Sequence, residues 1–381
     1  MNSVHAPKYI RKIKGFYILW FDYSNKYIVV NKDVMSLLNM YLESSNESDF
    51  LKRTNKQAQY SQLKSKEYYI ELSELLQECS ITTEKKPKTC LEFIPLQKKI
   101  TVYYKINDFV IQINYSSENV KALIHPQFAH FQNEEKSEIT IEFDVYLKNN
   151  ELILYKQNTF CSSFPKENYH LLQGKFAIEI LCLLTNKHEN DWLGTFHAST
   201  IGNTKESIML IGESGKGKST LSAILMANGF DLIADDFTPV LAESQNVYRY
   251  PSAISIKQGS YNVLKTIIPE IKDLPINNSN GIKGNIRYIP STIKFNPHKE
   301  YPCHKIICVN YQENSQTELT EISIDNVLNI LIPDSWISPE PKNVECFLTW
   351  LETCTFHKLT YSDADEVVQK FKTIFNEQNI D

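Results

Sequence analysis

The residues from Gly212 to Ser219 read Gly-Glu-Ser-Gly-Lys-Gly-Lys-Ser and match the phosphate-binding loop (P-loop) pattern G-x-x-x-x-G-K-S/T in full. An apolar run over 207–211 precedes the loop and predicts a buried strand. Residues 220–228 predict a helix that Gly229 ends in a left-handed turn. Strand, glycine loop and helix in this order are the context that the motif requires. The chain is therefore expected to contain an α/β unit whose loop surrounds phosphate groups.

The loop has the residue types that nucleotide phosphates require. Glycines let the backbone N–H groups point at phosphate oxygens, and the start of the helix adds partial positive charge. Lys218 is expected to reach the β- and γ-phosphates, and the Ser219 hydroxyl to take a coordination position on Mg²⁺. The predicted nucleotide-binding set is Gly212, Ser214, Gly215, Lys216, Gly217, Lys218, Ser219 and Thr220.

Two adjacent carboxylates, Asp235 and Asp236, follow the loop and its helix. They end the apolar run 232–234, which predicts a short buried strand, and in an open α/β sheet that end faces the ligand. Neighbouring carboxylates repel each other, whereas a divalent metal and an alcohol proton would give each of them a role. A solvated Asp-Asp turn is the alternative, but the position directly after a P-loop unit favours a functional pair.

This compact order of loop, helix, strand and acid pair resembles the HPr kinase/phosphorylase family and its structural relatives, the PEP carboxykinases. The matching segments are 212–219 and 232–236, and His197-Ala198-Ser199 upstream gives a third match. A weaker likeness continues through 250–257 and 285–290. The resemblance extends with less strength to the C-terminus and is poor in the first quarter of the chain.

The resemblance implies roles for these residues. Asp235 would be the general base that takes the proton from an acceptor hydroxyl, and Asp236 would ligate Mg²⁺ together with Ser219. His197 would lie near the transferred phosphate or Asp235 and orient rather than ligate. The glycine- and arginine-rich stretch that serves the reverse, phosphorolytic reaction in bifunctional members is not found in this sequence. A dedicated kinase is therefore expected, and the hexamers of relatives leave a homo-oligomer open.

A further cation near the γ-phosphate would help to neutralise the charge that develops during transfer. The sequence offers Lys216, Lys257 and Arg287 as candidates. We favour Arg287, because a planar guanidinium matches phosphate oxygens in a fork geometry. Each of the three, taken alone, is more often a solvated surface charge.

The chain of 381 residues is long enough for two or three domains. Residues 1–88 begin with two predicted strands, 15–21 and 26–30, followed by a helix over 34–42 with Asn31 or Asp33 as cap, and by a second helix around 71–78. This hairpin-helix segment resembles the PqqD-like winged module that holds leader peptides. The alternative is a docking subdomain without a ligand.

Residues 89–165 alternate apolar and polar side chains and predict a β-rich segment of antiparallel strands that packs on the kinase. Residues 166–381 form the predicted kinase domain, opening with a helix over 170–184. Near the C-terminus we expect a strand over 305–310 and helices over 324–331, 344–352 and 365–375, the last with Ser362 as cap. Residues 277–281 are expected to form a lid loop over the substrate.

These patterns give the fold class α/β, with α+β character overall. It comprises a P-loop core like that of HPr kinase and PEP carboxykinase, a β-rich middle segment and a small winged-helix-like N-terminal domain. The net charge of −5 argues against general nucleic-acid affinity, and no apolar run reaches the length of a membrane span. The N-terminus lacks the apolar segment of a signal peptide, so a cytoplasmic location is expected. The eight cysteines contain no C-x-x-C motif and predict neither a zinc site nor a disulfide framework.

We therefore expect a kinase that uses ATP or GTP with Mg²⁺ to phosphorylate a hydroxyl, with serine of a peptide or protein as the first choice of acceptor. Free serine or another small alcohol stays open as an acceptor. The alternative class is a regulatory module that binds nucleotide without transferring phosphate. Such a module can lose its base and keep its metal ligand, whereas this chain keeps both acids. A carboxykinase is disfavoured, because no extra basic cluster for a dicarboxylate is visible.

Overall fold

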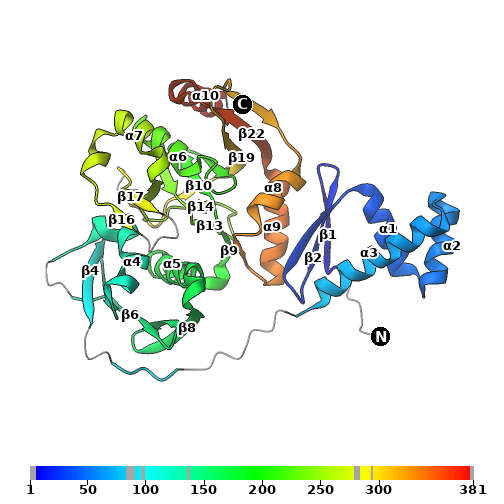
Figure 1. Ribbon diagram of the computed structural model, residues 1–381, viewed down its shortest axis with the longest axis horizontal. Helices are drawn as coiled ribbons and strands as arrows, with labels where there is room; N and C mark the ends of the chain where they lie inside the picture. The colour runs from blue at the N-terminus through cyan, green and yellow to red at the C-terminus, as the bar shows by residue number, and fades with distance from the viewer. Residues whose placement is uncertain are drawn as a thin grey trace.

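The computed structural model describes residues 6–82, 91–95, 99–134, 138–278, 284–292 and 295–377. Within these ranges the chain is a mixed α/β protein with five sheets, in agreement with the expected class (Figure 1). No helix in the described ranges combines the length and the apolar character that a membrane crossing requires. The predicted boundary at residue 88 lies outside the described residues, and the division into three domains stays a prediction.

The N-terminal unit is an antiparallel meander followed by three helices. Its elements are β1 (Tyr9–Ile13), β2 (Phe16–Phe21), β3 (Lys26–Val30), α1 (Lys32–Glu43), α2 (Glu47–Ala58) and α3 (Gln62–Ser80). Asn31 caps α1 as predicted, because its side chain accepts from the Val34 N–H at 2.9 Å. Helix α2 lies in the polar segment for which no element was predicted, and Asn46 caps it in the same way.

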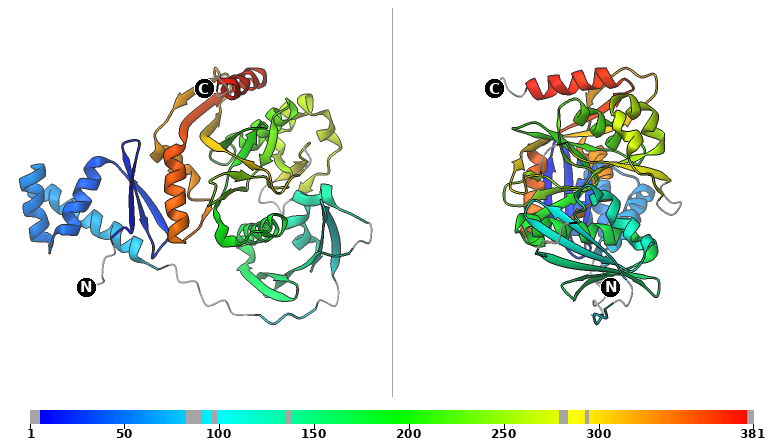
Figure 2. Two further views of the ribbon diagram at one scale, coloured as in Figure 1. Left: turned by 180° about the vertical axis from the view of Figure 1, so that it is seen from behind. Right: turned by 90° about the vertical axis from the view of Figure 1, so that its left-hand side faces the viewer.

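Strand β2 is apolar without alternation because both faces of this small sheet are covered. Leu19 and Phe21 pack with the unit's own helices. Ile18 and Trp20 belong to the core cluster that includes residues of α9 (Pro341–Thr353). The N-terminal unit therefore packs on the rest of the protein through its sheet, with α9 lying against it (Figures 1 and 2).

The middle segment is a five-stranded sheet in sequential order. Its strands are β4 (Ile100–Ile106), β5 (Phe109–Tyr115), β6 (Ile141–Lys148), β7 (Glu151–Lys156) and β8 (Thr159–Pro165), and α4 (Glu118–Phe128) and α5 (Tyr169–Thr185) pack on it. The expectation of antiparallel pairing holds for three of the four strand pairs. It is wrong for β5 and β6, which pair in parallel. Helix α4 between them returns the chain to the starting edge, as a parallel connection requires.

The largest sheet has the order β12-β10-β11-β19-β22-β20. Its strands are β10 (Ser199–Gly202), β11 (Ser207–Ile211), β12 (Asp231–Ala234), β19 (Cys303–Tyr311), β20 (Glu318–Glu321) and β22 (Thr355–Tyr361). Strands β11, β19 and β22 are parallel, and β10 runs antiparallel between β11 and β12. The carboxyl ends of β11, β12, β19 and β22 therefore lie at one edge of the sheet.

Helices cover both faces of this sheet, so β11 is buried along its whole length. Ile208 and Leu210 pack with α6 (Lys218–Ala227) and α10 (Ala364–Glu377), while Met209 and Ile211 pack with α8 (Ile324–Leu331) and α9. Helix α8 has the predicted bounds. The predicted cap of α10 is wrong: Asp363 accepts from the Glu366 N–H at 2.9 Å, whereas the Ser362 hydroxyl donates to the Ser315 carbonyl.

Two smaller sheets complete the core. One has the order β18-β14-β13-β9-β21, with β9 (Trp192–Phe196), β13 (Thr238–Leu241), β14 (Val247–Tyr248), β18 (Glu300–Tyr301) and β21 (Trp336–Ile337). The other has the order β15-β17-β16, with β15 (Ile254–Lys257), β16 (Asn277–Asn278) and β17 (Asn285–Ile289), and α7 (Tyr261–Ile267) follows β15. Of the predicted lid over 277–281, the first two residues form β16, and 279–281 lie outside the described residues.

Candidate nucleotide and phosphate site

The predicted site residues meet at one edge of the largest sheet. Strand β11 leads into the P-loop, and β12, which runs in the same direction, leads into Asp235 and Asp236. Strand β10 runs the opposite way and begins at Ser199, so its first residue and the preceding His197 lie at this edge too. The topology thus brings three segments that the sequence singled out to one place.

Glycine is required at three positions of the loop. Gly212, Gly215 and Gly217 have φ values of 155°, 86° and 95°, which side chains disfavour. A Cβ at Gly212 would also lie 2.8 Å from the Val309 carbonyl oxygen. Helix α6 begins at Lys218, directly after Gly217 and two residues earlier than predicted. Gly229, with φ 91°, ends the helix as predicted.

Lys218 is the buried cation of the loop. Its side chain lies inside the protein, and its Nζ donates to the Gly212 carbonyl at 2.7 Å. The ammonium is therefore held against the loop that would surround the phosphates. Thr220, the last member of the predicted set, exchanges a hydrogen bond of 2.6 Å with the Ser260 hydroxyl.

Asp235 is buried and held by three serines. The Ser199 hydroxyl donates to Oδ1, the Ser255 N–H donates to Oδ2 at 3.1 Å, and the Ser219 hydroxyl also donates to the carboxylate. Burial, and next the negative charge of Asp236, raise the pKa of Asp235 to about 7, against the effect of these donors. A carboxyl with a pKa in this range is poised to exchange a proton near neutral pH, although a bound cation would favour its charged form.

Asp236 has different surroundings from its neighbour. Its backbone is left-handed, with φ 59°, and 39% of its side chain is exposed. The Ser255 hydroxyl donates to Oδ2 at 3.1 Å, and the His197 Nε2 lies 3.9 Å from Oδ1, an ion-pair distance too long for a hydrogen bond. Ser255 therefore contacts both acids, although no sequence motif singles it out.

Strand β15 brings a further cation to the loop. Lys257 lies two residues after Ser255, on the same face of the strand, and its Nζ lies 3.0 Å from the Ser214 hydroxyl. Tyr288 of β17 pairs with Ser255, and burial followed by the charges of Asp236 and Asp235 raises its pKa to about 12. Tyr288 is a second residue near the acids that sequence reasoning missed.

Arg287, the cation favoured from the sequence, lies on the other face of β17. It pairs with Ile256, which is buried in the core, rather than with Ser255 or Lys257. Its guanidinium donates to the Gln258 side chain at 3.2 Å and lies 4.3 Å from the centre of the Tyr261 ring. Lys216 is exposed at the tip of the loop. Of the three candidates, Lys257 is the one with a contact to a loop side chain.

The residues at this sheet edge suit Mg²⁺, which takes several of its ligands from water and substrate, better than a metal whose ligands all come from the protein. Within the described ranges, no group of three or more His, Cys, Asp and Glu side chains is placed to hold a metal. Mg²⁺ typically binds one or two carboxylates and takes its other ligands from water and substrate phosphates. The buried Asp235 carboxylate beside the Ser219 hydroxyl is such a partial set.

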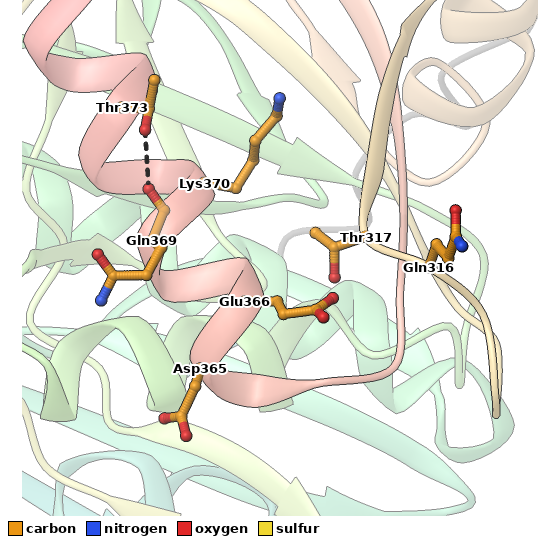
Figure 3. Close-up of a pocket in the computed structure, with 7 residues that line it drawn as sticks. All are labelled: Gln316, Thr317, Asp365, Glu366, Gln369, Lys370 and Thr373. Atoms are coloured by element: carbon orange, nitrogen blue, oxygen red, sulfur yellow. Dashed lines mark hydrogen bonds between the residues drawn. The ribbon is translucent and has the colours of Figure 1, made fainter.

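A groove of about 690 Å³ lies elsewhere on the surface, between α10 and the segment before β20 (Figure 3). Gln316 and Thr317 line one side, and side chains of α10 such as Glu366 and Lys370 line the other. The groove shares no lining residue with the P-loop or the acid pair. It therefore adds nothing to the phosphate site.

Comparison with known proteins adds little. No protein-family model matches the chain, and no curated protein matches it. Among solved structures, it is similar to the HPr(Ser) kinase/phosphatase from Coxiella burnetii, with 14% sequence identity and a TM-score of 0.24, over 49% of this chain and 96% of that one. An identity and a TM-score this low carry no argument about what this chain does.

Replacing Lys257 by Met is expected to weaken the binding of a non-hydrolysable ATP analogue by about three- to tenfold. The reason is the loss of a positive charge beside the loop, at a position exposed enough for solvent to reduce its effect. Equilibrium binding measures this change. The matched control is Lys265→Met, because Lys265 is an exposed lysine of α7 that bonds to Asn262. Equal affinities of the two variants would contradict a role for Lys257.

Proposed function

We propose that the protein is a nucleoside triphosphate-dependent kinase that transfers the γ-phosphate to a hydroxyl group, with Mg²⁺ as its metal. One observation carries the proposal: a P-loop and an acid pair lie at the same sheet edge, and Ser255 bonds to both acids. Phosphoryl transfer asks a protein to hold the nucleotide, neutralise charge and direct an acceptor in line. The loop amides and Lys218 serve the first two tasks, and a carboxylate of the pair serves the third.

Mg²⁺, when bound with the nucleotide, would neutralise phosphate charge. The chain's own residues supply the rest. Glycines of the loop allow close approach of the backbone, Lys218 offers a buried positive charge, and Lys257 adds a second charge from β15. Ser199 and Ser255 fix the position of the acid pair, which reduces the reorganisation needed during the reaction.

We infer that the acceptor is a serine of a peptide or protein. The N-terminal unit supports this choice, since its order of three strands and three helices suits the PqqD-like resemblance, and modules of that kind hold peptides. Free serine or another small alcohol is the second candidate. A nucleotide-binding regulatory module is the alternative class, and the half-exposed Asp236 beside His197 argues against it, because binding alone gives that carboxylate no task.

The acceptor class is tested by comparing kcat/KM for serine-containing peptides with that for free serine, using γ-labelled ATP and GTP with Mg²⁺. A peptide acceptor predicts a much higher kcat/KM for at least one peptide than for the free amino acid. A higher value for free serine would reject the peptide assignment and retain the kinase. The variant that carries both Asp235→Asn and Asp236→Asn is the background control, because it lacks both carboxylates.

A further inference from the structure

Resting on the proposed kinase function, we propose that the acceptor lies against an aromatic wall formed by Tyr169, Phe237 and Tyr288, and that this wall selects a serine flanked by an apolar residue. The three rings come from the start of α5, from the residue after the acid pair and from β17. All three are half-buried, so each ring keeps part of its apolar surface for a ligand. The proposal names the residue beside the acceptor serine, which the kinase function alone leaves open.

Tyr288 lies beside the acids because of strand register. It pairs directly with Ser255, whose N–H donates to Asp235 and whose hydroxyl donates to Asp236, each at 3.1 Å. Directly opposite residues of an antiparallel pair share one face of the sheet, with Cβ atoms about 4.5–5.5 Å apart. Within the described ranges the Tyr288 hydroxyl takes part in no hydrogen bond, so it is available to a ligand.

Tyr169 brings the middle segment to the same place. Helix α5, which begins at Tyr169, lies between the middle sheet and the core, and its buried residues share a cluster with Ala234, the residue before the acid pair (Figure 1). Burial and then the two charges of the acid pair raise the pKa of Tyr288 to about 12, and Tyr169 adds a smaller effect in the same direction. Tyr169 therefore borders Tyr288 and the acids.

Phe237 completes the wall from the sheet edge itself. It follows Asp236 directly, after the left-handed backbone at φ 59°. The centre of its ring lies 4.5 Å from that of Tyr250, which is buried, and it packs against the same cluster as Tyr169. The ring is thus fixed one residue away from the half-exposed Asp236 carboxylate.

The wall and the phosphate cations differ in chemistry. Lys218 and Lys257 contact the P-loop, whereas the three rings offer apolar area close to the acids. Aromatic rings bury a large apolar surface when a ligand packs on them. An acidic neighbour of the acceptor serine would instead lie close to two carboxylates, and like charges in contact are costly. Free serine has no flanking side chain that could reach the wall.

The test measures phosphate transfer from γ-labelled ATP with Mg²⁺ to three peptide pools. Each peptide has one serine, and the residue beside it is fixed as leucine, alanine or aspartate in the respective pool. We expect the wild type to phosphorylate the leucine pool about tenfold faster than the alanine pool, since larger apolar side chains gain affinity of this order in an apolar site. The aspartate pool is expected to be the slowest.

Tyr288→Ala and Tyr169→Ala are expected to lower the ratio of leucine to alanine rates to about twofold. Tyr288→Phe keeps the ring and is expected to keep the wild-type ratio. The matched control is Tyr103→Ala, because Tyr103 is a half-buried tyrosine of β4 that pairs with Gln112 in the middle sheet. A partial loss of folded protein lowers all rates together and leaves this ratio unchanged, so the ratio reports contact with the acceptor.

Equal rates with the leucine and alanine pools in the wild type would overturn the proposal and leave the kinase function in place. A wild-type ratio in both alanine variants would do the same, as would transfer to free serine and to none of the pools. If the wild type transfers label neither to a pool nor to free serine, the kinase function itself fails and the wall has no acceptor to select. Transfer without preference and absence of transfer therefore distinguish the two failures.

Discussion

Replacing Lys218 by Met is expected to lower phosphate transfer by on the order of 10²–10³-fold, the cost of removing one preorganised charge that stabilises a transition state. Lys218 is buried at the start of α6, and its Nζ is held against the P-loop backbone at Gly212. A neutral side chain of similar length keeps the packing and removes the charge. Initial rates with γ-labelled ATP measure the effect.

The control for Lys218→Met is Lys370→Met in α10, because Lys370 lines the groove of Figure 3, which shares no lining residue with the P-loop or the acid pair. This control is expected to transfer phosphate at the wild-type rate. Thermal melting separates loss of chemistry from loss of folding, since the inactive variant should melt within a few degrees of the wild type. Transfer by Lys218→Met at the wild-type rate would show that the P-loop does not serve the reaction.

The metal-free wild-type protein is expected to become less stable as the pH rises from about 4 to about 7. Replacing Asp235 by Asn is expected to remove this pH dependence. The unfolded chain releases this proton at an ordinary pKa of about 3.9, whereas burial and Asp236 raise the folded pKa to about 7. Between these values the folded state binds more protons than the unfolded state, so stability falls with rising pH. Each unit between the two pKa values is worth about 1.4 kcal/mol, so the effect is on the order of several kcal/mol.

Thermal melting in a chelating buffer, followed from pH 4 to pH 8, measures this difference. The slope of Tm against pH is the readout, because an amide at this position also alters the hydrogen bonds with Ser199 and Ser255 at every pH. Asp273→Asn is the matched control at an exposed position and should keep the wild-type slope. Equal slopes in all three proteins would mean that Asp235 is charged throughout and that its surroundings stabilise the charge.

Much of the fold followed from local pattern. The P-loop, its flanking strand and helix, the acid pair at the end of β12 and the exact bounds of α8 all arise from short-range order, where periodicity and glycine positions decide the structure. Helix α2 was missed because its composition is polar and only Phe50 and Thr54 are buried. The parallel pairing of β5 and β6 was missed because it depends on α4, for which no helix was predicted.

The candidate site shows more clearly what could not be predicted from the sequence. From the sequence we favour Arg287 over Lys257 as the further cation, and the register of β15 against β17 reverses that choice. Because side chains alternate along a strand, this register faces Lys257 toward the loop and Arg287 toward Tyr261. The contacts of Ser199 and Ser255 with Asp235 were not predicted for the same reason, because residues distant in sequence meet Asp235 only after the strands have paired.

The kinase assignment is tested most directly by following the γ-phosphate of labelled ATP in a single turnover with Mg²⁺ and a mixture of serine peptides. We predict that the label appears on an acceptor hydroxyl with wild-type protein and not with the variant lacking both carboxylates. Label that stays on the nucleotide, or passes only to water at the same rate in both proteins, would contradict the account. It would leave a protein that binds nucleotide without transferring phosphate.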